Sequence, residues 1–356
     1  MIGPFSKNQA LIAGGVVAVV VIGGATAFAL SGNSSKKSDA QSTPVVTSSS
    51  PTPTPTPTPT KTTAAPKPKP TPVNPLTGTG PVPTGPVIGV KVDDTENGRP
   101  SRGIDQSDVL YIEEAEGGLT RMLAVFDTNR PVVEAVRSVR ASDPELLEQY
   151  GPITLVASGG GGDSLSTLAA STIHGVINDS GGPGFSRDGN RPAPYNLQSD
   201  LGQVTANVKT ASVKSIGFTF LAASPELAKA PTIQNVHTTV GSTSVDFRWE
   251  PTISKYVRMI DGQHLMAADG KLVAATNILV QTCQVTVNPN DVDVEGNASR
   301  YTHTIGSGVI VLYRNGKKIV GRWSRSSANA ATRYVDSAGR PLYMAPGNTI
   351  VALTSA

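Results

Sequence analysis

Charged residues of both signs are concentrated in one stretch of the chain, residues 99–140. Three acids, Glu113, Glu114 and Glu116, follow an apolar run at residues 109–112. Neighbouring carboxylates can act as a general acid/base pair or bind Mg²⁺ or Ca²⁺. In a strand, Glu114 and Glu116 share one face while Glu113 points to the other. The alternative is a solvated strand end beside a Gly-Gly turn.

Three arginines lie close to these acids. Arg121 opens an expected strand at residues 120–127, and Arg137 and Arg140 follow a second one at residues 132–136. If the two strands pair as an antiparallel hairpin, Arg121 and Arg137 fall at the same edge of the sheet. Guanidinium groups gathered there would hold a phosphate or a carboxylate. They would equally well neutralise the acids, and both readings stay open.

A glycine-rich turn, SGGGG at residues 158–162, separates a buried apolar strand at 153–157 from an expected helix at 165–170. Free backbone N–H groups at such a turn can hold an anion, which makes Ser158 and Gly160 candidates. The spacing matches neither a Walker loop nor a dinucleotide fingerprint. The alternative is a turn in which the backbone packs closely.

A long loop follows at residues 180–194, rich in Gly, Pro, Arg and Asn. Long loops in compact domains are often functional. Arg187, Arg191 and Tyr195 could therefore cover a site, or the loop could be an ordinary surface excursion.

The chain has no recognisable metal or nucleophile motif. Its histidines stand in neither HxH nor HExxH spacing, and no G-x-S-x-G elbow occurs. Cys283 is the only cysteine, which excludes an internal disulfide, and it lies in an alternating strand-like run that predicts a buried side chain. We expect no metal and no cofactor.

The N-terminal part predicts a membrane anchor and a spacer. Residues 11–30 are uncharged, and about 20 helical residues span a bilayer core. A cleaved signal peptide is the alternative, because Ala27-Phe28-Ala29 resembles a cleavage site. Residues 33–75 are rich in Pro, Thr and Ser and predict a disordered, extended linker.

The charge balance excludes a nucleic-acid-binding class. The whole chain carries +3, but six of its 30 basic residues and only one of its 27 acids precede residue 76. The remaining part therefore carries about −2, whereas nucleic-acid binding needs a strongly basic domain.

We predict a mixed α and β (α+β) fold in two domains after the anchor (1–32) and the linker (33–75). The first, an α/β domain at residues 76–230, contains strands at 87–92, 109–112, 120–127 and 132–136. A helix begins at Ser142, whose SDPE sequence has the form of a capping box. The second domain, at 231–356, is strand-rich, and Asn315-Gly316 predicts a hairpin turn. Its expected strands are residues 240–249, 253–259, 278–287, 308–314, 317–323 and 349–353.

Several motifs together resemble one family. They are the stretches RP at 99–100, GIDQSDV at 103–109, EGGLTR at 116–121, LAVF at 123–126 and VRSVR at 136–140, followed by PAPYNL at 192–197 and RWSR at 322–325. Their order and spacing resemble the YerB-like lipoprotein family, bacterial envelope proteins of unknown biochemical function. Two departures are Tyr195, where the family usually has His, and Ile112, where an acid often stands. The resemblance covers about residues 75–356 and implies an exported protein, although no cysteine near the N-terminus could carry a lipid.

Two function classes follow. The first is a non-catalytic, membrane-anchored envelope module, anchored through residues 11–30, that binds an anionic cell-wall polymer or another envelope protein. The second is an enzyme on envelope glycopolymer, a phosphotransferase or hydrolase loosely similar to LytR-CpsA-Psr enzymes. The candidate ligand-binding residues are Arg99, Glu113, Glu116, Arg121, Arg137, Arg140, Ser158, Gly160 and Asn196.

Overall fold

The computed structural model describes residues 72–209, 213–293 and 295–356. The expected anchor at 11–30 and the linker up to residue 71 lie outside these residues. Among the described residues, no helix is long and apolar enough to cross a membrane. They all belong to one compact unit. Asn74, at the expected end of the linker, is already buried and donates to Thr128 Oγ1 at 3.3 Å.

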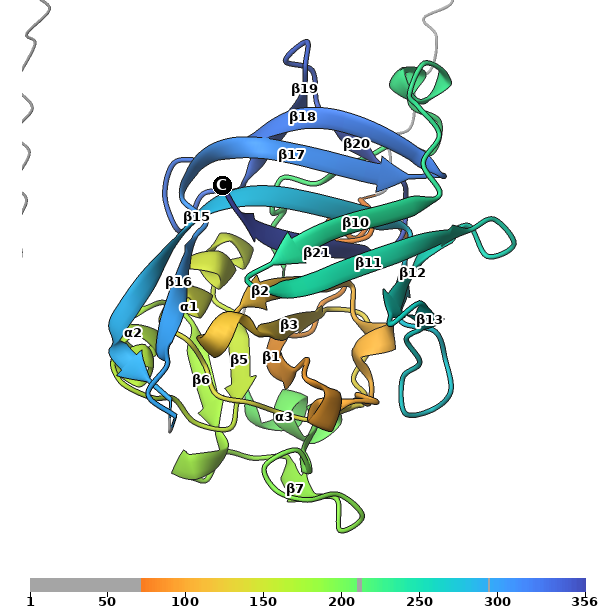
Figure 1. Ribbon diagram of the computed structural model, residues 1–356. Coiled ribbons are helices and arrows are strands. Elements are labelled where there is room, and N and C mark those ends of the chain that lie inside the picture. The colour runs from red at the N-terminus through yellow and green to blue at the C-terminus, as the bar shows by residue number, and fades with distance from the viewer. Residues whose placement is uncertain (1–71, 210–212, 294) are drawn as a thin grey trace, which may run out of the picture. The chain divides into compact units, whose positions relative to one another are not determined.

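A large sheet of eleven strands dominates the fold (Figure 1). Ten strands run in the order β19-β18-β17-β15-β21-β2-β3-β1-β5-β6, and β16 pairs with β15. Their bounds are β1 Ile88–Asp93, β2 Val109–Glu114, β3 Thr120–Phe126, β5 Thr154–Ala157, β6 His174–Ile177, β15 Asn277–Val292, β16 Ala298–His303, β17 Gly306–Arg314, β18 Lys317–Arg325, β19 Arg333–Asp336 and β21 Thr349–Ser355. The regions on either side of residue 230 share this sheet, because β2 pairs in parallel with β21.

The centre of the sheet is buried on both faces. Val109 and Tyr111 of β2 pack into one hydrophobic core, and Leu110 and Ile112 into the other. Side chains alternate between the faces of a strand, so a central strand needs apolar residues at every position. The continuous apolar runs of β2 and β3 in the sequence meet this requirement.

Three smaller sheets and several short helices complete the unit. The sheets contain β10 Asn235–Val240, β11 Thr243–Glu250, β12 Lys255–Ile260, β13 Gln263–His264 and β14 Ala274–Ala275; β4 Val132–Glu134, β8 Leu197–Asp200 and β7 Phe185–Arg187; and β9 Thr219–Phe220 with β20 Tyr343–Met344. The described α-helices are α1 Ser142–Leu147, α2 Ser164–Ala170 and α3 Leu201–Asn207. Six 3₁₀ turns accompany them: η1 Glu96–Gly98, η2 Ile104–Gln106, η3 Glu116–Gly118, η4 Glu148–Tyr150, η5 Asn178–Ser180 and η6 Pro225–Ala228. The mixed α and β class is confirmed, with strands far in excess of helices.

Most expected strands are present, and Asn315-Gly316 makes the β17–β18 turn with positive φ at both residues. Two local predictions are wrong. The strands at 120–127 and 132–136 do not form a hairpin, because β1 and β2 occupy both edges of β3 and β4 pairs with β8. Ser142 does not cap α1, because Ala141 is the N-cap residue and no side chain caps this helix.

Candidate functional site

The sheet brings Arg121 and Arg137 to one end of β1. In the β1–β3 register Arg121 lies opposite Asp93, and the Arg137 N–H donates to the Lys91 carbonyl at 2.9 Å. Arg140 follows three residues later. The two arginines are neighbours as predicted, but strand β1 joins them rather than a hairpin. We call Arg121, Arg137 and Arg140 the arginine site.

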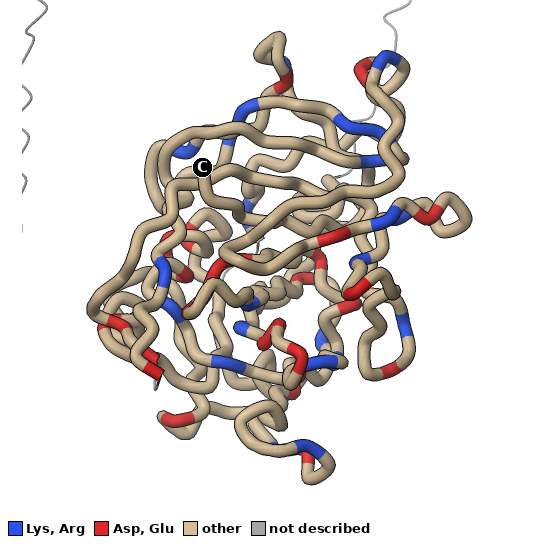
Figure 2. Tube along the Cα trace, viewed as in Figure 1, with Lys and Arg blue, Asp and Glu red and all other residues tan. Residues whose placement is uncertain are grey.

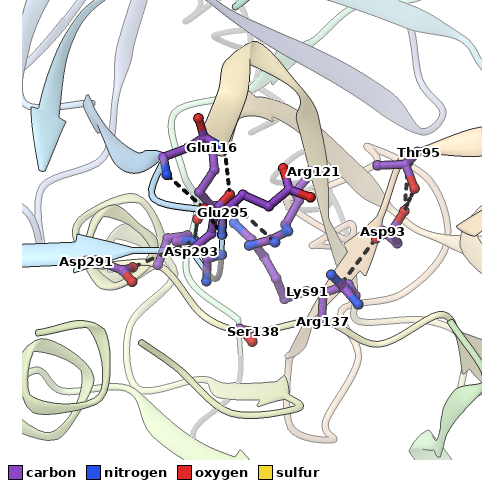
Figure 3. A network of polar contacts seen from close by, with 12 residues as sticks. Lys91, Asp93, Thr95, Glu116, Arg121, Arg137, Ser138, Asp291, Asp293 and Glu295 are labelled. Atoms are coloured by element: carbon purple, nitrogen blue, oxygen red, sulfur yellow. Dashed lines mark hydrogen bonds and ion pairs between the residues drawn. The ribbon is translucent and has the colours of Figure 1, made fainter. Parts of the chain in front are cut away.

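Glu116 forms ion pairs with two of the arginines, Arg121 and Arg140, and Figure 3 shows it close to Arg121. Its Oε2 is 3.1 Å from Arg121 Nη2, and its Oε1 accepts from Arg140 Nε. Burial opposes ionisation of this carboxyl, but the bond from Arg140 and the charge of Arg121 outweigh it and lower its pKa. One carboxylate therefore serves two guanidinium groups.

Arg137 has a separate partner. Its Nε lies 3.1 Å from Asp93 Oδ2, and its guanidinium stacks on the Tyr195 ring at 5.4 Å. The Asp93 carboxylate also accepts from Thr95. With 21% of its side chain exposed, Arg137 is the most accessible of the three arginines. The Tyr195 contact brings the chain directly after the loop at 180–194 against the site.

One nitrogen of Arg121 has no partner among the described residues. Nη1 is buried and makes no hydrogen bond. Burial, together with the charge of Arg140, lowers the pKa of Arg121 to about 10. A buried donor without an acceptor carries a desolvation cost of about 1–3 kcal/mol. An anion beside this nitrogen would remove that cost.

The acids are not a solvated strand end, and that alternative is wrong. Glu113 is buried and paired with Lys91, which also donates to Asp143 Oδ1 at 2.7 Å. Burial raises the pKa of Glu113 to about 7, against the opposing charge of Lys91. Glu114, on the opposite face, pairs with Arg300 at 3.0 Å. Both carboxylates that pair with Lys91, those of Glu113 and Asp143, therefore belong to a buried ionic group. This group adjoins the arginine site, because the Arg140 N–H donates to Asp143 Oδ2.

The glycine-rich turn lies against the arginine segment. The Ser158 N–H donates to the Arg137 carbonyl at 2.9 Å, and a Cβ on Gly160 would meet Val139 Cγ1 at 2.8 Å. A Cβ on Gly161 would collide with the Asp291 carboxylate. The glycines therefore allow close packing, with an acid beside the turn where an anion would have to lie.

Two candidates lie apart from the arginines. The Arg99 guanidinium donates to the Asp94 carbonyl at 2.8 Å, and Asn196 Oδ1 accepts from Arg187 at 2.8 Å. Neither side chain hydrogen-bonds to the arginine site within the described part of the chain. Asn196 contributes indirectly, because it fixes the loop that carries Tyr195.

Comparisons with known proteins agree with this fold. The family model described as "Protein of unknown function (DUF3048) N-terminal domain" matches residues 76–214, and its C-terminal counterpart matches residues 235–351. The chain belongs to this family. A Bacillus subtilis (strain 168) relative named "Putative lipoprotein YerB" is 25% identical over 250 residues, which cover 67% of this chain and 72% of that protein. The crystal structure of YerB protein from Bacillus subtilis superposes with a TM-score of 0.64 at 21% identity and covers 78% of this chain and 95% of that one.

Both domains of the DUF3048 family contribute to the site. The arginines belong to the N-terminal match, whereas Asp291 belongs to the C-terminal one. Asp291 Oδ2 accepts from Ser164 Oγ at 2.9 Å and lies 3.8 Å from Arg140 Nε. Sequence reasoning missed Asp291, since nothing near it in the chain indicates this contact. Asp93 had a usable signal, because it directly follows the first expected strand.

Proposed function

We propose that the protein is a membrane-anchored, extracytoplasmic binding module of the bacterial envelope. In this proposal the arginine site holds an anionic group of a cell-wall polymer. Residues 11–30 supply the anchor, and the Pro/Thr-rich residues after them supply the reach. The name of the Bacillus subtilis relative, a lipoprotein, supports an envelope location.

The observation that carries the proposal is the buried, unpartnered Nη1 of Arg121. It lies in a group where Arg121 and Arg140 share Glu116, and the Asp291 carboxylate lies farther away, 3.8 Å from Arg140 Nε. A phosphate or carboxylate would supply the missing acceptor through a charge-assisted hydrogen bond. Arg137 lies at the exposed side of the same group, where it can meet an incoming polymer.

Sedimentation of the full chain with purified bacterial cell walls tests this proposal. An Arg137→Ala variant is expected to bind at least about tenfold more weakly, because one hydrogen bond to a charged group contributes about 1.5–3 kcal/mol. Walls stripped of phosphate polymer provide the ligand control. Arg300→Ala removes a nearby arginine that pairs with Glu114 outside the arginine site, and it should bind as the wild type does. Unchanged binding by both Arg121→Ala and Arg137→Ala would refute the proposal.

The catalytic alternative uses the same arginines, so the same variants distinguish an enzyme from a binding module. A phosphotransferase or hydrolase would turn over a pyrophosphate-linked lipid and lose turnover in Arg121→Ala. Binding without turnover is the result that the binding module predicts.

A further inference from the structure

A groove far along the sheet from the arginine site opens beside β18. It has a volume of about 830 Å³, within the range of small-molecule sites. Its floor is formed by β18 around Val320 and by Val309 of β17. The segment 226–231 forms one wall and the loop 336–340 the other.

The floor of this groove is unusually apolar for an exposed sheet. Val309 is 46% exposed and Val320 is 52% exposed. In the β17–β18 register Val309 lies opposite Arg322, and Val311 lies opposite Val320, so these side chains share one face. Exposed apolar side chains gathered between polar walls indicate a binding surface.

The rim carries positive charge without internal partners. Arg340 is neutralised by Asp336 at 2.7 Å and Glu226 at 3.4 Å. Three other lining cations form no side-chain hydrogen bond or ion pair within the described residues; they are Lys229, Lys318 and Arg322. Figure 2 shows basic residues along β18 and charged residues on the two loops beside it. The groove therefore combines an apolar floor with an excess of positive charge at its edge.

We propose that this groove binds a single anionic amphiphile, with its apolar chain along Val309 and Val320 and a phosphate head on the basic rim. A phosphate monoester carries about −1.5 to −2 charges at pH 7, which matches several free cations better than one carboxylate does. A bilayer surface would be met by protruding apolar side chains, whereas these valines lie between two walls. This site is separate from the arginine site and does not depend on its function.

Equilibrium dialysis of octyl phosphate, below its micellar concentration, tests the proposal. The full chain is held in phosphatidylcholine nanodiscs, and uptake by empty nanodiscs is subtracted. We expect saturable binding of one equivalent, and octanol, which lacks the phosphate, should bind at least about tenfold more weakly.

Variants locate the binding. Val320→Asp and Arg322→Glu should each weaken it by about tenfold or more. Val287→Asp alters a valine that is 53% exposed but lies outside the groove, and it should bind as the wild type does. Loss of octyl phosphate binding in Arg137→Ala would place the ligand in the arginine site and would overturn the proposal for the groove. The proposal would be overturned if octyl phosphate showed no saturable binding, or if Arg322→Glu bound it as the wild type does. It would also be overturned if octyl phosphate were taken up only when the nanodiscs contain anionic lipid.

Discussion

At the scale of single residues, the ion pair between Asp94 and Arg258 should dominate stability. Both side chains are fully buried, and two bonds of 2.8 and 2.6 Å join them. Arg258→Ala would leave the buried Asp94 carboxylate with only the more distant Arg99, at 3.9 Å, as a counter-charge, and loss of a buried ion-pair partner costs about 3–5 kcal/mol in free energy of unfolding. Arg300→Ala, which breaks the more exposed pair with Glu114, should cost less than about 1 kcal/mol. Urea unfolding measures both, and equal costs would contradict this ranking.

Glu113 should make stability depend on pH. Its pKa in the folded protein, about 7, lies above the ordinary value of 4.5, mainly because the carboxyl is buried. The folded state therefore holds this proton more tightly than the unfolded state does. The free energy of unfolding should fall as pH rises from about 4.5 to about 7, by about 3 kcal/mol from this group. Glu113→Gln should flatten this slope, and an unchanged slope in thermal melts across that range would contradict the assignment.

The arginine site was partly predictable at this scale. Arg121, Arg137 and Glu116 stood out because charges beside short apolar strands have to be paired or solvated. Which partner each would take was not predictable, because Glu116 bonds to two arginines and Asp291 reaches Arg140 from the other half of the chain. Such contacts depend on the three-dimensional fold rather than on neighbouring sequence.

At the scale of elements, two turn glycines test how much the conformation and packing of a tight turn contribute to stability. Gly316 has φ +69°, and an added Cβ would lie 3.1 Å from Trp249 Nε1; Gly339 has φ +77° with open space around it. Gly339→Ala should cost about 1 kcal/mol from backbone conformation alone. Gly316→Ala should cost more, because the Trp249 contact adds to the same conformational term. Equal losses in denaturant melts would show that Trp249 adjusts freely.

Strand positions were more predictable than strand partners. Alternation and β-branched residues marked β11, β12, β15, β17, β18 and β21 correctly. Pairing followed the sequence only where a short turn forced it, as between β17 and β18. Between β3 and β4 the turn was also short, but β3 already had a neighbour on each side. A local pattern does not reveal which edges are already occupied.

At the scale of the molecule, one sheet runs through both family domains. Near residue 231 the sequence changes from a mixture of strand and helix patterns to strand patterns alone, and this change lies between the two family matches. It carries no information about strand pairing across that boundary. The contact is a parallel pairing of β2 with β21, and parallel partners are distant in sequence by necessity. Leu110 and Ile112 on one strand and Ile350 and Ala352 on the other are all buried there. Each half therefore covers apolar strand surface of the other.

This arrangement predicts that the N-terminal half does not fold alone. In a chain that ends at residue 230, the β2 edge would lose β21 and expose Leu110 and Ile112 to water. Such a chain is expected to show no cooperative thermal transition and to regain one when residues 231–356 are supplied as a separate chain. Deletion of residues 51–60, which precede the compact unit, should leave the melting temperature of the full chain unchanged. A cooperative melt of the 1–230 chain within a few degrees of the full-length protein would show that the two halves are independent despite their common sheet.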